Sequence, residues 1–172
     1  MNSIGGIPIA SGFNGLKPAI KVVEVRDWED FHPNPDASSF LDGSFFLLSP
    51  RALEVLHGFI QPNCEELCGT MPEGYEHYRL FNVITLLDAI DLESSTVKYF
   101  NSGQVMDIKE YTFFKEIISE QHLFRDSKFR RTFVTDNFYK AVKKENLTCF
   151  DFVQVWDSEA SQPFKPIYEC WA

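Results

Sequence analysis

The sequence predicts an α+β fold, with a mixed, mostly antiparallel sheet and a few short amphipathic helices packed on it. Short runs of aromatic and β-branched residues recur between turn-forming residues, as is typical of strands. Two of these runs, ending at Leu48 and Val134, lead directly into helix start signals and amphipathic patterns. The 172 residues include 17 Phe and are 44% hydrophobic, which is enough material for one sizeable core.

The first elements follow a segment rich in Gly, Pro, Ser and Asn. We expect residues 1–19 to be a mobile N-terminal segment and residues 20–172 to form a single domain. A short strand is expected over residues 19–25. The two prolines of a His-Pro-Asn-Pro-Asp stretch predict an irregular connection over residues 27–42.

A strand and a helix are expected next. The Phe-Phe-Leu-Leu run at residues 45–48 predicts an apolar strand. Ser49 is a favourable N-cap, and Pro50 suits the first helical position because its fixed φ angle matches the helix. The predicted helix ends near Pro62 and carries its apolar side chains on one face, namely Ala52, Leu53, Leu56, Phe59 and Ile60.

The middle of the chain contains weaker patterns. Residues 61–76 are predicted to be a loop with an acidic surface, and residues 78–87 a strand. A further strand is expected over residues 96–100, with a turn at residues 101–103. Residues 111–118 fit both a helix face and a strand, and their aromatic and β-branched content favours the strand.

Residues 122–156 predict strand, capped helix and strand in close succession. Thr135 or Asp136 can cap the helix with a side-chain oxygen. The helix has a mostly apolar stripe and a lysine face, and Asn146 is placed to leave it in a left-handed turn. The stripe consists of Phe138, Ala141, Val142 and Glu145, and the lysines are Lys140, Lys143 and Lys144. An aromatic run over residues 150–156 predicts the final strand.

The charge distribution limits the classes of partner. The formal net charge is −9 and the pI is about 4.9. Residues 1–121 carry a net charge of −10, whereas residues 122–145 carry +4, which the solvated face of the predicted helix explains. An acidic protein is a poor ligand for nucleic acid or anionic membrane, and it favours a basic partner. No apolar run approaches the roughly 20 residues of a membrane span, and no secretory signal is recognisable, so we expect a cytoplasmic protein.

No sequence motif indicates an enzyme or a metal site. The chain has no glycine-rich phosphate loop, no G-x-S-x-G elbow and no H-E-x-x-H pair. The four cysteines and four histidines do not have zinc-ligand spacing, so we expect free thiols, no metal and no cofactor. Asp88, Asp91 and Glu93 are the tightest acidic cluster near a predicted strand end. Such carboxylates can perform acid–base chemistry, but more often they belong to a solvated loop.

Several segments carry a family resemblance. They are LLSPRALEVL, YRLFNVITLLDAID, HLFR and FVTDNFYKAVKKENLTCFDF, within residues 40–156. Together they resemble the bacterial polymorphic-toxin immunity protein family built on domain of unknown function 1629. Leu123-Phe124-Arg125 matches its "φ-F-R" element. The last family motif is matched by Val134-Thr135-Asp136, Phe138, Ala141, Leu147-Thr148 and Phe152. The family commonly has glycine at the position of Cys149. This departure raises the question whether the turn at Cys149 needs a positive φ angle in this protein.

The resemblance implies an immunity-type protein that neutralises a cognate toxin by direct protein–protein association, with no catalytic residue. Two acidic surfaces are the candidate partner-binding sites, the first with two aromatic anchors beside it. The first comprises Glu65, Glu66, Glu73, Tyr75, Glu76 and Tyr78, and the second Asp88, Asp91 and Glu93. The alternative function is a small enzyme or ligand-binding protein using the second set of carboxylates. A structural or assembly subunit is a third possibility.

Overall fold

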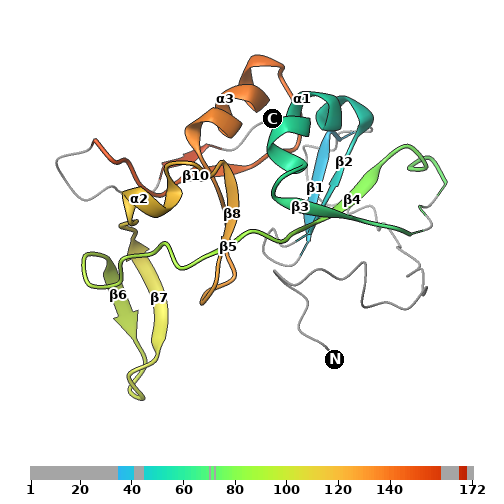
Figure 1. Cartoon of the computed structure of the whole chain (residues 1–172). Helices are drawn as coiled ribbons and strands as arrows, with labels where there is room; N and C mark the ends of the chain where they lie inside the picture. The colour runs from blue at the N-terminus through green and yellow to red at the C-terminus, as the bar shows by residue number, and fades with distance from the viewer. Residues whose placement is uncertain (1–34, 41–44, 70, 72, 160–166, 170–172) are drawn as a thin grey trace.

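The computed structural model describes residues 35–40, 45–69, 71, 73–159 and 167–169 (Figure 1). These residues form mostly antiparallel strands and three short helices, which confirms the predicted α+β class. The strands are divided among four small sheets. The segment expected to be mobile, residues 1–19, and the strand expected over residues 19–25 lie outside the described residues.

The largest sheet has four antiparallel strands in the order β1-β2-β4-β3. The strands are β1 (Ala37–Phe40), β2 (Phe45–Leu48), β3 (Cys64–Leu67) and β4 (Arg79–Val83). Strand β2 has the predicted bounds. The predictions of an irregular connection at β1 and of a loop at β3 are wrong. Both are edge strands. Strand β3 has the sequence Cys-Glu-Glu-Leu, and an edge strand tolerates such adjacent charges. The sequence pattern therefore does not reveal this strand.

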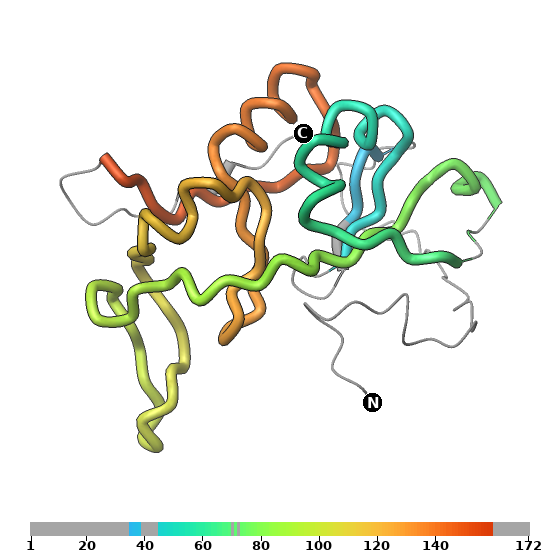
Figure 2. The backbone as a smooth tube through the Cα atoms, in the orientation of Figure 1, coloured from blue at the N-terminus to red at the C-terminus, as the bar shows by residue number. Residues whose placement is uncertain are grey.

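Helices α1 (Pro50–Ile60) and α3 (Asp136–Lys144) lie together beside this sheet (Figures 1 and 2). The Oγ atom of Ser49 accepts a hydrogen bond from the Ala52 N–H at 3.0 Å, as predicted for an N-cap. Phe59 of α1 meets Phe138 of α3 edge to face, with ring centroids 5.4 Å apart. The first hydrophobic core lies between these helices and the sheet. Its buried residues are Ala37, Leu48, Ala52, Leu56, Ile60, Phe81, Val83, Leu123, Phe138, Val142 and Leu147.

Helix α3 ends as the sequence predicts. Asn146 adopts a φ angle of 50°, and the Leu147 N–H donates to the Val142 carbonyl at 3.1 Å, which is the pattern of a Schellman motif. At the other end Thr135 is the N-cap, but its side chain makes no cap hydrogen bond. The Thr135 Oγ1 lies 2.9 Å from His122 Nδ1 instead, so this residue joins the start of the helix to the residue that precedes Leu123.

Asp36 connects three elements that are distant in the sequence. Its carboxylate accepts hydrogen bonds from Ser49 Oγ at 2.8 Å and from the Thr148 N–H at 2.9 Å, and it pairs with Arg51 at 2.9 Å. Asp36 is 6% exposed, so the N-terminus of α1 and the turn after α3 are held to a buried charge. In that turn Cys149 has a φ angle of 62°. The position therefore does adopt the left-handed conformation that a glycine would favour.

The second part of the molecule contains shorter elements. Strand β8 (Leu123–Asp126) pairs in parallel with β5 (Leu86–Leu87) and antiparallel with β9 (Thr132–Val134). Strands β6 (Thr96–Tyr99) and β7 (Val105–Glu110) form a separate hairpin. The second hydrophobic core lies between these units. Its buried residues are Ala89, Ile90, Ile108, Tyr111, Phe113 and Phe124.

Two predictions need correction in this part. The strand predicted over residues 78–87 is divided into β4 and β5. The strand interpretation of residues 111–118 is wrong at its end, where α2 (Lys115–Ile118) forms. Phe113 makes an isolated bridge with Ile90, and none of the described strands extends that pairing. Strand β7 was not predicted.

Strands β10 (Phe152–Gln154) and β11 (Ile167–Glu169) pair antiparallel near the C-terminus.

Within the described residues, no helix has both the length and the apolar character needed to cross a membrane.

Candidate functional site

The structure separates the two glutamates of β3. Glu65 and Glu66 are neighbours on a strand, so their side chains point to opposite faces of the sheet. Glu65 Oε1 accepts a hydrogen bond at 2.7 Å from Asn82 Nδ2, and Asn82 is fully buried. Glu66 is exposed and forms an ion pair with Arg79 at 3.3 Å. Glu66 is therefore accessible to a partner, whereas Glu65 supports the sheet.

The remaining acidic residues of the first candidate surface lie in the turn before β4. Glu73 and Glu76 are exposed. Glu76 Oε1 accepts a hydrogen bond at 3.0 Å from the N–H of Gly74, whose φ angle of 87° requires a residue without a Cβ atom. Hydrogen bonds from the Glu76 and Gly74 backbone N–H groups lower the pKa of the Glu76 carboxyl. The turn thus presents stable negative charge at neutral pH.

The two tyrosines beside this turn have different positions. Their ring centroids are 5.1 Å apart. Tyr75 is half-buried, whereas Tyr78 is 9% exposed and its hydroxyl donates to the Pro35 carbonyl at 2.8 Å. Burial raises the pKa of Tyr78. Tyr78 therefore supports Tyr75 from the interior, and Tyr75 is the accessible ring of the pair.

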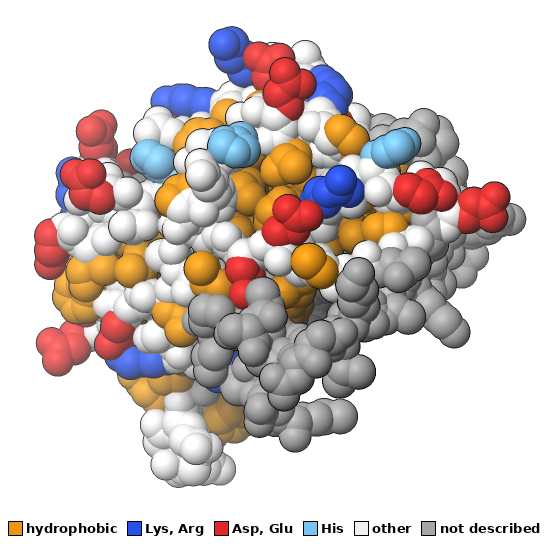
Figure 3. All heavy atoms as spheres, turned by 45° about the vertical axis from the view of Figure 1, so that its right-hand side comes forward, with side chains coloured by type: hydrophobic (Ala, Val, Ile, Leu, Met, Phe, Trp, Pro, Cys, Tyr) orange, Lys and Arg blue, Asp and Glu red, His pale blue; other side chains and the backbone are white. Residues whose placement is uncertain are grey.

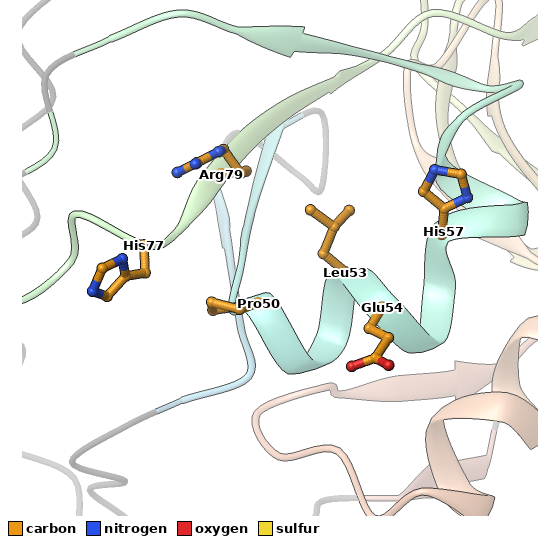
Figure 4. A pocket seen from close by; sticks show the side chains of 6 residues that line it. All are labelled: Pro50, Leu53, Glu54, His57, His77 and Arg79. Carbon is orange, nitrogen blue, oxygen red and sulfur yellow. The ribbon is translucent and has the colours of Figure 1, made fainter.

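A surface depression of about 640 Å³ adjoins this turn (Figure 4). Four lining residues come from the exposed flank of α1, one comes from the segment before β4, and one is the first residue of β4. They are Pro50, Leu53, Glu54, His57, His77 and Arg79. In Figure 4 the Leu53 side chain points from α1 towards β4, and in Figure 3 apolar surface on this side of the molecule is interspersed with charged side chains. The lining thus combines apolar side chains with charged ones and two imidazoles.

Sequence reasoning did not identify the depression. The α1 pattern predicts Leu53 as a core residue, and Leu53 does pack partly against the first core. The depression exists because the sheet brings Arg79 beside α1 although the two are far apart in the sequence. Arg79 also joins the depression to the acidic turn, because its guanidinium pairs with Glu66 and donates to the Glu76 carbonyl at 3.2 Å.

The second candidate surface is a turn stabilised by its own carboxylates. Asp88 Oδ1 lies 2.7 Å from Lys128 Nζ. Asp91 Oδ1 accepts hydrogen bonds from the Glu93 and Ser94 N–H groups at 3.0 and 3.1 Å, and hydrogen bonding to Ser94 lowers the pKa of Asp91. Glu93 is exposed. The two aspartates thus bind separate partners, and neither lines the depression described above.

Three of the cysteines lie within the described residues. Across the described ranges, no three or more His, Cys, Asp or Glu side chains are grouped so that they can hold a metal ion. Cys64, Cys68 and Cys149 are free thiols. Burial raises the pKa of Cys64 to about 12, so this thiol stays protonated at neutral pH.

Arg125 of the "φ-F-R" element has a structural role. It is 1% exposed, and its Nε and Nη2 atoms donate to the Arg130 carbonyl at 3.3 and 3.1 Å. Arg130 has a φ angle of 59° in the turn between β8 and β9. Burial lowers the pKa of Arg125. Its guanidinium thus holds this turn in place, as expected of a residue that the fold requires.

The fold and these surfaces define a small α+β protein whose candidate sites lie at the surface, on turns and on a helix flank. A search of curated proteins found no match. The family model described as Immunity protein family (Imm11) matches residues 65–157, which is more than half of the chain. The chain belongs to this immunity protein family. The predicted resemblance to an immunity family is confirmed, while the domain number 1629 stays a prediction.

Proposed function

We propose that this protein neutralises a cognate toxin by direct, stoichiometric association in the cytoplasm, without a cofactor and without catalysis. The observation that carries the proposal is the family match, which extends from β3 to the residues beyond β10. Binding is favoured over catalysis because Asp88 and Asp91 have separate structural partners. An acid–base pair would need two carboxyl groups that face the same substrate-binding site.

The toxin surface that binds is proposed to be basic. The chain has a net charge of −9, so a positive partner is attracted before contact. Such complementarity raises the association rate and orients the partner more than it adds to the final affinity. Nucleic acid and anionic membrane would be repelled by the same charge.

The first acidic surface is the proposed centre of this contact, and the second surface, with Asp88, Asp91 and Glu93, is its second candidate. In the first, Glu66, Glu73 and Glu76 contribute exposed charge and Tyr75 contributes an accessible ring, while Glu65 and Tyr78 support them from within the fold. The depression beside Arg79 extends this surface onto α1. Together they offer a continuous site for part of the roughly 800 Å² that a stable interface needs on each partner.

The function is tested with the protein encoded by the gene immediately upstream. We expect the purified chain to capture that protein in a one-to-one complex, measured by pull-down and size-exclusion chromatography with light scattering. We also expect co-expression to rescue cells from its toxicity. A protein that neither binds nor rescues would contradict the proposed function.

The binding surface is tested by the triple variant Glu66→Lys, Glu73→Lys, Glu76→Lys. We expect the association rate with the toxin to fall about tenfold or more at low salt, and to fall less at high salt because ions screen the charges. Stopped-flow or surface-plasmon measurements give both rates. Glu65 is left unchanged because its carboxylate binds the buried Asn82.

The matched control is Glu116→Lys, Glu120→Lys, Glu159→Lys. It makes the same change in net charge at three exposed acidic residues outside both candidate surfaces. If both triple variants slow association equally, the net charge alone matters and the surface assignment is wrong. If neither triple variant slows association, the proposal of a basic partner is wrong as well.

A further inference from the structure

The β6–β7 hairpin extends away from the body of the molecule (Figures 1 and 2). Its strands pair with each other in a two-stranded sheet that no other described strand joins. A hairpin of this size is at best marginally stable by itself, so it depends on contacts at its base. Its outer end projects away from the other described helices and strands.

The outer end of the hairpin is uncharged and carries exposed hydrophobic side chains beside its turn. Tyr99 is 52% exposed, Phe100 49% and Met106 41%, and Tyr99 and Phe100 are the two most exposed of the large hydrophobic residues in the described ranges. Residues 99–106 read Tyr-Phe-Asn-Ser-Gly-Gln-Val-Met, without an acidic or basic side chain. We call residues 99–106 the hairpin tip. In the free protein its aromatic rings are exposed to water, so the favourable free energy of burying them is not gained.

The tip is nevertheless well structured. The Phe100 N–H donates to the Gln104 carbonyl at 2.8 Å, and the Gly103 N–H donates to the Phe100 carbonyl at 2.9 Å. Gly103 provides the positive φ angle of 81° that this turn requires. The tip therefore presents its rings from a defined turn, which lowers the entropy cost of ordering them in a complex.

Contacts at the base hold the hairpin against the second core. Ile108 of β7 is 6% exposed and packs in that core. The Asp107 carboxylate pairs with Lys109 at 2.5 Å and with Arg131 at 3.4 Å, and Arg131 also donates to the Tyr111 hydroxyl. The charges at the base are thus bound within the molecule. Burying the tip against a partner does not leave them unpaired.

We propose that the hairpin tip inserts into a concave, apolar-lined site on the toxin, with Tyr99 and Phe100 as anchors. This inference rests on the proposed function and deepens it, because it adds a second contact far from the acidic turn. The acidic surface steers the basic partner, while the uncharged tip contributes close packing after encounter. Aromatic residues that enter a pocket account for a large share of binding energy in protein interfaces.

The net charge of the chain favours the toxin over two other possible partners of the hairpin tip. A second copy also carries a net charge of −9, and an anionic membrane is negative, so both are repelled at long range. A narrow, convex tip also offers too little flat surface to form the roughly 800 Å² that a stable dimer needs from each subunit. A cleft on a basic protein complements both the shape and the charge.

The test is the double variant Tyr99→Ser, Phe100→Ser, with the protein of the upstream gene as the probe. We expect the dissociation constant to rise about 30-fold or more, mainly through faster dissociation, as for the loss of a central interface anchor. The conservative variant Tyr99→Phe, Phe100→Tyr keeps both rings and should retain binding within a few-fold. Thermal unfolding checks that each variant is folded; the single serine variants replace the double one if it is not.

The matched control is Leu86→Ser, Val153→Ser. These residues are 40% and 41% exposed and lie on β5 and β10, so the control removes similar exposed apolar surface elsewhere. Wild-type binding by the tip variant would overturn this inference and leave the proposed function standing. A wild-type chain that neither binds nor rescues would overturn both. A tip-dependent dimer, or tip-dependent binding to vesicles of anionic phospholipid, would replace the toxin as the occupant.

Discussion

The first hydrophobic core, beneath α1 and α3, is mainly aliphatic, whereas half of the buried residues of the second core, at the base of the hairpin, are aromatic. Only two of the buried residues in the first core are aromatic, Phe81 and Phe138. In the second core, Phe113 contacts the rings of Phe124, Phe133 and Trp156 at centroid distances of 6.4, 5.1 and 5.6 Å. In the first core, regular helices pack on a sheet. In the second core, side chains from short strands and the segments between them pack against one another.

This difference explains why one core was predictable and the other was not. An amphipathic helix repeats its apolar residues at a known period, so α1 and α3 are recognisable from local sequence. The aromatic residues of the second core come from separate short segments and have no common period. Their packing depends on contacts between residues that are far apart in the chain, such as Arg131 with Tyr111 and Asp107.

The largest expected effect tests the second core. Phe124 is 2% exposed, and Phe124→Ala should lower the free energy of unfolding by about 3–5 kcal/mol, because the surrounding rings cannot fill the cavity. Urea unfolding followed by circular dichroism measures the loss. Leu56→Ala in the first core, at a fully buried position, should cost about 2–5 kcal/mol. A loss below about 1 kcal/mol for Phe124→Ala alone would mean that the second core is loosely packed.

A smaller effect is expected at the buried carboxylate that ties α1 to the turn after α3. Asp36→Ala should lower the free energy of unfolding by about 1–3 kcal/mol, because the Ser49 hydroxyl and the Thr148 N–H lose their acceptor. Urea unfolding followed by circular dichroism measures this loss in the free energy of unfolding. Asp157→Ala is the control, since that carboxylate is exposed and accepts a local hydrogen bond. Equal effects of the two variants would show that the Asp36 contacts add no net stability.

The smallest effect is a gain in stability. Cys149→Gly should raise the free energy of unfolding by about 0.5–1 kcal/mol, because glycine adopts the φ angle of 62° without strain and that gain exceeds its entropy cost. The midpoint of urea unfolding measures the change. Cys149→Ala removes the thiol and keeps the Cβ atom, so it should bring no such gain. If both variants stabilise equally, the thiol and not the backbone angle is responsible.

The candidate site was predictable only in part. The acidic residues at Glu66, Glu73 and Glu76 are exposed as a polar loop would have them, and the assignment of these residues to toxin binding stays a prediction. The depression between α1 and β4 could not be predicted, because strand pairing brings its two sides together. The domain limits, residues 20–172, also stay a prediction.

Local sequence patterns predict the α+β class, strand β2, helices α1 and α3, and the left-handed turn at Asn146. These features depend on interactions between residues close in the chain, which local patterns report. The tertiary structure alone decided that β1 and β3 are edge strands, that Tyr78 is buried beneath Tyr75, and that the hairpin tip is exposed. Each of these depends on which distant segments pack together, and local sequence carries little information about such long-range contacts.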